Sequence, residues 1–172
     1  PQAEEPVQAW STGKIAEEGF CIEKVMLTTR PGVKATCNVY LPEQSDGKGP
    51  AILFLCGHSV EGKACERYQL IARLLVARGF VVLLLDPLGQ GERMGYYDAD
   101  RKQLGVRGGT GDHEYSGLQC TLQGHNLARY LLHDAIRAVD YLSGHPRVDP
   151  ERIGVTGSSG GGTQTLLMML VE

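Results

Sequence analysis

The sequence predicts an α/β fold: a mostly parallel sheet with helices on both faces, preceded by an antiparallel hairpin. The chain begins with two segments of alternating polarity, continues with two uninterrupted apolar runs separated by an amphipathic helix, and ends in helix, strand and helix. Because crossovers between parallel strands are right-handed, this order places the later strands in one sheet and distributes their helices over both faces.

The hairpin is indicated by two segments that change polarity at every second residue. They are CIEKVMLTTR (residues 21–30) and KATCNVYLP (residues 34–42), and the turn dipeptide Pro31-Gly32 lies between them. Alternation with period two is typical of strands that bury one face.

Two continuous apolar runs, AILFLCG (51–57) and FVVLLLD (80–86), are typical of parallel strands covered on both sides. The intervening YQLIARLLVARG predicts a helix that ends at Gly79. We expect this helix to bury one stripe of apolar residues. The stripe consists of Leu70, Ile71, Leu74 and Leu75.

The second half contains the clearest helix, residues 126–145, followed by a short strand at 152–157 and a helix at 163–171. The apolar positions of the long helix recur at helical spacing. They are Leu127, Leu131, Ala135, Val139 and Leu142. The predicted strands and helices all lie within residues 21–172, so we expect this range to be the N-terminal part of a single domain. Residues 1–20 are expected to be an N-terminal extension lying over that domain.

Composition excludes several classes of function. The formal net charge is −3, so no basic surface for nucleic acid is expected. No apolar run approaches the ~20 residues that span a bilayer, so we expect no membrane partner. The sequence suggests no cofactor and no metal, and it leaves the cellular compartment open.

The segment Gly157-Ser158-Ser159-Gly160-Gly161 fits G-x-S-x-G and lies between a predicted strand and a predicted helix. A serine on such a turn projects its hydroxyl above the edge of the sheet, and the tight turn requires small neighbours. The register of the motif selects Ser159 as the nucleophile. The alternative is a glycine-rich connector that binds phosphate at the start of the helix.

A serine nucleophile needs N–H donors for the oxyanion that forms during acyl transfer. The backbone N–H of Gly160 is one expected donor. The second is expected in the loop after the 51–57 strand, from the backbone N–H of His58, where Gly57 lets the chain approach the substrate. His58 as the general base is an alternative reading of the same loop.

The same loop also matches G-x-x-x-x-G-K over residues 57–63, and the next strand is followed by Asp86-Pro87-Leu88-Gly89. Together these suggest a P-loop nucleotide-binding protein. Ala64 stands where the magnesium-binding hydroxyl should be, and no N-K-x-D motif occurs, so this alternative is the weaker one.

With the serine turn, the loop after the 51–57 strand and the segment that begins at Asp86, the chain resembles the acetyl xylan esterase-like branch of the α/β-hydrolases, which is related to dienelactone hydrolases. The resemblance rests on four segments and extends over most of residues 21–172. They are GHSVEGK (57–63), DPLGQGER (86–93), NLARYLLHDAIRAVDYL (126–142) and VDPERIGVTGSSGGGTQT (148–165). It implies an α/β-hydrolase fold and a serine carboxylester hydrolase that acts on small acyl esters, including acetyl groups on carbohydrate.

The stretch 95–124 is long for a connection, and long connections are often functional. It and the following residue contain polar side chains that we expect to line the substrate pocket. They are His113, Glu114, Tyr115 and His125. Metal ligation by His113 and Glu114 is an alternative, although no spacing supports a full ligand set.

In α/β-hydrolases the acid and histidine of the triad follow the nucleophile in the chain, after later strands. Only one predicted helix follows Ser159 before residue 172. We therefore expect both residues outside this chain, and we expect a C-terminal half, a second chain or a homo-oligomer to complete the sheet. The alternative is a catalytically inert remnant used for binding or assembly.

Overall fold

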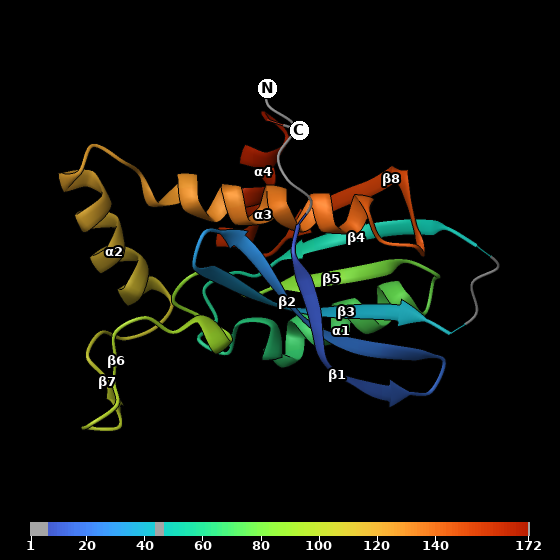
Figure 1. Cartoon of the computed structure of the whole chain (residues 1–172), viewed down its shortest axis with the longest axis horizontal. Helices are drawn as coiled ribbons and strands as arrows, with labels where there is room; N and C mark the ends of the chain where they lie inside the picture. The colour runs from blue at the N-terminus through green and yellow to red at the C-terminus, as the bar shows by residue number, and fades with distance from the viewer. Residues whose placement is uncertain (1–6, 44–46, 172) are drawn as a thin grey trace.

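The computed structural model describes residues 7–43 and 47–171, which form one mixed sheet with helices on both faces (Figure 1). In chain order, the strands of this sheet are β1 (Ala9–Glu17), β2 (Phe20–Arg30), β3 (Val33–Pro42), β4 (Gly49–Leu55), β5 (Val81–Leu85) and β8 (Val148–Gly157). The α-helices are α1 (Glu66–Val76), α2 (Thr110–Leu122), α3 (Leu127–Ser143) and α4 (Gly160–Met168). The short elements are η1 (Gly62–Ala64), η2 (Gly91–Arg93), β6 (Tyr97–Asp98) and β7 (Gln103–Leu104).

The sheet has the order β1-β2-β3-β5-β4-β8. The first three strands and the β3–β5 pair are antiparallel, whereas β4 runs parallel to both β5 and β8. Leu55 of β4 is in register with Leu85 of β5 and with Gly157 of β8. The three parallel strands therefore finish at the same level, and the loops that follow them meet at one edge.

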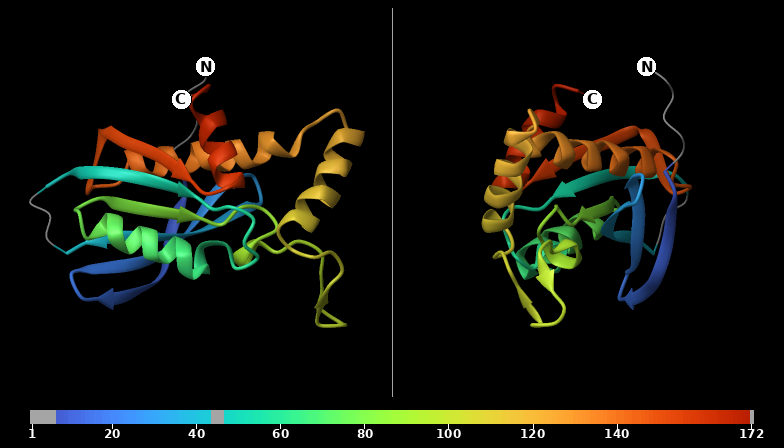
Figure 2. Two further views of the ribbon diagram at one scale, coloured as in Figure 1. Left: turned by 180° about the vertical axis from the view of Figure 1, so that it is seen from behind. Right: turned by 60° about the vertical axis from the view of Figure 1, so that its left-hand side comes forward.

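Successive side chains along each strand point to opposite faces of the sheet, so the sheet separates two hydrophobic cores. On one face, α1 packs Tyr68, Ala72 and Val76 against a cluster that includes Phe54 and Leu84. On the other face, α3 and α4 cover a second cluster with Ala135, Ala138, Leu142 and Met168. Figure 2 shows α1 on the opposite side of the sheet from α3 and α4. The predicted α/β-hydrolase arrangement, with helices on both faces, is confirmed.

Two of the longer elements, β1 and α2, were not predicted from the sequence. The predicted N-terminal extension contains β1, which pairs with β2 from Ala9 to Glu17 and so belongs to the sheet, while residues 1–6 lie outside the described part of the chain. The predicted connection 95–124 contains α2, which extends away from one end of the sheet (Figure 1). Glycine and polar residues in both segments hide the helical and strand periodicities.

The predicted apolar stripe of α1 is partly wrong. Leu70 and Leu74 are 56% and 51% exposed, whereas Ile71 and Leu75 are half-buried against the core. The buried stripe runs instead through Tyr68, Ala72 and Val76.

Strand β8 is the last strand in the sheet order, and in the described residues it pairs with β4 alone. Several apolar side chains at the end of α4 and just beyond it are exposed. They are Leu166, Met169, Leu170 and Val171, at 62%, 72%, 76% and 53%. Unpaired sheet edges and exposed apolar patches favour association. Within the described ranges, no helix is both long and apolar enough to cross a membrane.

Candidate active site

The candidate site lies where the loops after β4, β5 and β8 meet. In open α/β sheets, ligands bind at the carboxyl ends of the strands, at the point where the strand order reverses. Strand β4 lies between β5 and β8, and the chain reaches β5 through α1 and β8 through α3. The loops after these strands contain His58, Asp86 and Ser159 respectively.

Ser159 occupies a sharp turn between β8 and α4. Its backbone has φ 53° and ψ −116°, a conformation that costs a non-glycine residue about 1–3 kcal/mol. The residue is exposed, and Gly160 begins the helix directly after it. A strained serine with an exposed side chain between a strand and a helix is the geometry that a nucleophile turn requires.

The turn is so tight that side chains at its glycines would collide with backbone atoms. A Cβ at Gly161 would lie 1.9 Å from the carbonyl oxygen of Leu55, and one at Gly157 would lie 2.4 Å from the carbonyl carbon of Gly161. A Cβ at Gly57 would lie 2.5 Å from the carbonyl oxygen of Ser158. These three glycines therefore let α4, the turn and the loop after β4 pack backbone against backbone.

Two buried side chains fix the loop that carries His58. The Gln90 amide nitrogen donates to the carbonyl oxygen of Gly57 at 2.6 Å and to that of Ser59, on either side of His58. The Tyr68 hydroxyl accepts from the N–H of Gly57 at 3.1 Å and is hydrogen-bonded to the side chain of Ser158. Burial raises the pKa of Tyr68, so its hydroxyl stays protonated.

Sequence reasoning missed Gln90 and Tyr68. Gln90 lies in the DPLGQGER segment that carries the family resemblance. The sequence does not show that this polar residue is fully buried, so it gave no reason to single Gln90 out. Tyr68 gave no signal, because an aromatic residue in an amphipathic helix is read as core. The backbone N–H groups of His58 and Gly160 donate to no acceptor in the described part of the chain.

The structure brings His113 into this site through His58. The Nε2 atom of His58 lies 3.0 Å from Nδ1 of His113, and Nε2 of His113 lies 2.7 Å from the carbonyl oxygen of Leu88. Partial burial, and then the neighbouring His113, lower the pKa of His58. No hydrogen bond joins His58 to Ser159 within residues 7–43 and 47–171.

The other predicted pocket residues do not converge with His113. Glu114 and Tyr115 are exposed on α2, and the Tyr115 ring packs edge-on against Tyr96 at 4.8 Å between centroids. His125 lies beyond the end of α2, near Arg129. No group of three side chains that could together bind a metal ion occurs in the described ranges.

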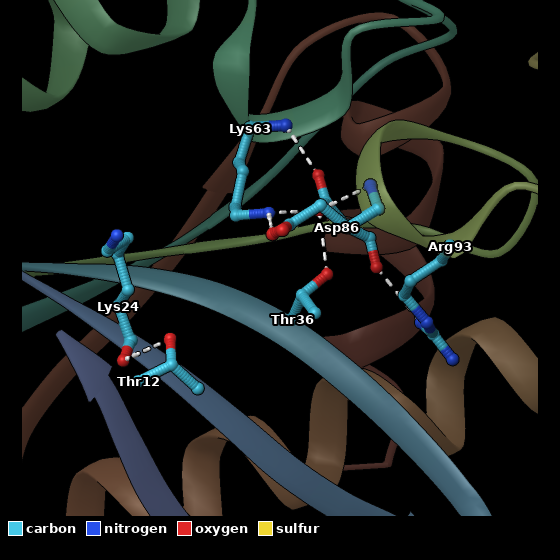
Figure 3. Close-up of polar contacts among 7 residues, drawn as sticks. Thr12, Lys24, Thr36, Lys63, Asp86 and Arg93 are labelled. Atoms are coloured by element: carbon cyan, nitrogen blue, oxygen red, sulfur yellow. Dashed lines mark hydrogen bonds and ion pairs between the residues drawn. The ribbon is translucent and has the colours of Figure 1, made fainter.

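The residues of the P-loop-like motif form an internal ion pair. Lys63 binds Asp86 with its ammonium group, and its backbone N–H donates to Asp86 Oδ1 at 2.7 Å (Figure 3). Thr36 donates to Asp86 Oδ2 at 2.7 Å, and Arg93 donates to the Asp86 carbonyl oxygen at 2.9 Å. Burial acts to lower the pKa of Lys63, but hydrogen bonds and charge from Asp86 and Glu92 raise it.

This ion pair contradicts the nucleotide-binding alternative. In a P-loop, the lysine and the loop N–H groups point at phosphate. Here the side chain of Lys63 is 7% exposed, and its ammonium group is bound by two carboxylates, Asp86 and Glu92. The motif is explained by the packing of the loop after β4 on the loop after β5.

Comparison with known proteins agrees with this geometry. Residues 21–171 match the acetyl xylan esterase (AXE1) family. A candidate hydrolase of Bacillus subtilis (strain 168), YtaP, is 24% identical over 151 residues, which cover 82% of this chain and 46% of that protein.

Solved structures show the same fold. A candidate acetyl xylan esterase of Bacteroides fragilis superposes with a TM-score of 0.77 at 20% identity, over 94% of this chain and 44% of that one. Acetyl xylan esterase 1 of Thermoanaerobacterium superposes with a TM-score of 0.70 at 23% identity, over 97% and 49%. This chain therefore spans about half the length of these relatives. With its strained serine turn and its match over residues 21–171, the chain belongs to the acetyl xylan esterase family of α/β-hydrolases.

Proposed function

We propose that this chain provides the nucleophile and the oxyanion-binding groups of a serine carboxylester hydrolase that acts on small acyl esters. The observation that carries the proposal is Ser159, exposed in a strained conformation between β8 and α4. Strain of this kind persists only where the surrounding structure imposes it, and it is concentrated at functional sites. The three glycines packed backbone against backbone impose it here.

In the proposed mechanism, the Ser159 hydroxyl attacks the ester carbonyl carbon while a general base takes its proton. The carbonyl oxygen becomes an oxyanion and accepts hydrogen bonds from the N–H groups of His58 and Gly160. The alcohol then leaves with a proton, an acyl-serine remains, and water hydrolyses it by the same steps. Gln90 and Tyr68 hold the donor loop during both steps.

The general base and its acid are proposed to lie outside these 172 residues. Within the described residues His58 makes no hydrogen bond to Ser159, and its Nε2 is engaged by His113. Strand β8 presents an edge at which a further parallel strand can pair. A C-terminal half, a second chain or another copy that adds strands beside β8 could place a histidine above Ser159. The names of the similar proteins point to acetyl groups on carbohydrate as the acyl substrate.

The test is hydrolysis of a chromogenic short-chain ester by the intact protein, compared with two adjacent variants. Ser159→Ala should lower kcat/KM by about 10⁴-fold or more, because removing a triad member leaves only a small residual catalysis. Ser158→Ala is the matched control and should retain activity within about tenfold, since the side chain of Ser158 bonds to Tyr68 and is not the proposed nucleophile. Equal activity of the Ser159→Ala variant and the unmodified protein would refute the proposal.

A further inference from the structure

Two hydrogen bonds in series connect the loop after β5 to the loop after β4 through two histidines. They run from the carbonyl oxygen of Leu88 to Nε2 of His113, and from Nδ1 of His113 to Nε2 of His58, at 2.7 and 3.0 Å. His113 belongs to α2, whereas His58 follows β4. The two rings meet edge to face with 4.9 Å between their centroids.

The chemistry of these two hydrogen bonds fixes where the protons are when both rings are neutral. A carbonyl oxygen can only accept, so Nε2 of His113 must carry a hydrogen. A neutral imidazole carries one N–H, so Nδ1 of His113 is bare and accepts from Nε2–H of His58. Nδ1 of His58 is then also bare. Both rings are therefore held as the Nε2–H tautomer by one backbone oxygen.

The bare edge of the His58 ring lies against the residue that follows the nucleophile. A Cβ at Gly160 would lie 2.4 Å from Cε1 and 2.7 Å from Nδ1 of His58. The ring therefore fills the space that a side chain at position 160 would need. His58 and Gly160 are also the two proposed donors to the oxyanion, so the ring of one donor residue packs directly on the backbone of the other.

From this packing we infer that His113 is a positioning residue that holds the oxyanion-binding site from α2. By fixing the orientation and tautomer of His58, it keeps the His58 ring against Gly160 and thereby fixes the spacing of the two donor peptides. Both nitrogens of His113 are engaged, so it acts on the substrate only through His58. This inference rests on the proposed function, and it gives α2, the unpredicted helix, a role in catalysis.

The kinetic test uses two variants of the intact protein. His113→Phe keeps an aromatic ring but removes both ring nitrogens. His113→Asn removes the ring but places an amide oxygen near the position of Nδ1. We expect His113→Phe to lower kcat by about 10–100-fold with little change in KM, because oxyanion contacts strengthen in the transition state. We expect His113→Asn to recover at least tenfold of that loss. An unchanged kcat in His113→Phe would overturn the inference.

A spectroscopic test needs no activity and no successful variant of His113. Long-range ¹H–¹⁵N correlation spectra of histidine-labelled protein at about pH 8, above the ordinary pKa of ~6.5, distinguish the two tautomers. We expect the Nε2–H tautomer for both His58 and His113, with His58 assigned by the loss of its signals in His58→Gln. The Nδ1–H tautomer at His58, or an even mixture, would overturn the inference.

The two proposals can fail separately. If the intact protein hydrolyses esters and Ser159→Ala does not, but His113→Phe matches the unmodified protein, the positioning role is wrong and the proposed function stands. If the intact protein hydrolyses no ester, the proposed function is wrong and the positioning role falls with it.

Discussion

At the scale of single residues, the buried ion pair between Lys63 and Asp86 organises the loops beneath the site. Asp86 is fully buried, and five donor groups converge on its carboxylate and carbonyl oxygens. Arg93 extends the network by binding Asp134 of α3 at 2.8 Å. A buried carboxylate of this kind is tolerated only while its partners remain, because an unpaired charge in the interior is costly.

Lys63→Met should therefore lower the free energy of unfolding by about 3–5 kcal/mol, because it leaves Asp86 buried without its cation. Glu92→Gln is the matched control: the same ammonium group binds Glu92, but that side chain is 70% exposed. The control should cost less than about 1 kcal/mol. Urea denaturation measures both, and similar losses for the two variants would contradict this account of the network.

The same residues show where sequence reasoning stops. Ser159 and the glycines beside it were predicted because their spacing directly encodes a backbone turn. Lys63 and Asp86 were noticed only as a weak phosphate-binding pattern, because a pair separated by 23 positions leaves no local signal. The contact between His58 and His113, which are 55 positions apart, was unpredictable for the same reason.

At the scale of elements, helix α4 illustrates how one backbone contact determines which glycine is required. A Cβ at Gly161 would overlap the carbonyl oxygen of Leu55 at 1.9 Å, whereas one at Gly162 would lie 3.7 Å from its nearest neighbour, the carbonyl oxygen of Gly157. Both residues belong to the first turn of the same helix. Substituting each in turn therefore distinguishes the effect of the close contact with Leu55 from the effect of losing the backbone flexibility of glycine.

Gly161→Ala should destabilise the protein by about 3 kcal/mol or more, because backbone atoms cannot move aside as a flexible side chain can. Gly162→Ala should stabilise it by about 0.5–1 kcal/mol, because alanine is the better helix former. The midpoint of urea denaturation measures both changes. Destabilisation of equal size in the two variants would show that the helix, and not the contact with Leu55, is the sensitive feature.

The fold was predictable where the apolar pattern is strong and was missed where glycine or polar residues interrupt it. Strands β2, β3, β4 and β5 and helix α3 lie close to their predicted bounds, since each carries either a clear period or an uninterrupted apolar run. Strand β1 was missed because its residues are mostly exposed and it joins the sheet only at the edge, by pairing with β2. Helix α2 was missed because its only fully buried residue is polar, Asp112.

At the scale of the whole molecule, helices cover both faces of the sheet, and strand β8 forms an edge at which a further strand can pair. Strand β8 is half-exposed or exposed along most of its length, and the apolar residues at the end of α4 and just beyond it are exposed as well. Relatives about twice as long share the fold of this chain. These observations support the proposal that further strands pair with β8.

The 172-residue chain expressed by itself should therefore self-associate, because among the described residues the outer edge of β8 is unpaired and the apolar residues at the end of α4 and beyond it are exposed. Sedimentation velocity at several concentrations should show species larger than the monomer. Leu170→Glu, which places a charge at a position that is 76% exposed, should reduce the association. A stable monomer that unfolds cooperatively would contradict the proposed completion of the sheet.

The central claim is that Ser159 is an activated nucleophile, and covalent labelling tests it most directly. The intact protein is treated with a serine-reactive fluorophosphonate, and the modified peptide is identified by mass spectrometry. We predict a single adduct on Ser159, which persists in Ser158→Ala and disappears in Ser159→Ala. An adduct on another serine, or no adduct in a protein that hydrolyses esters, would contradict the account.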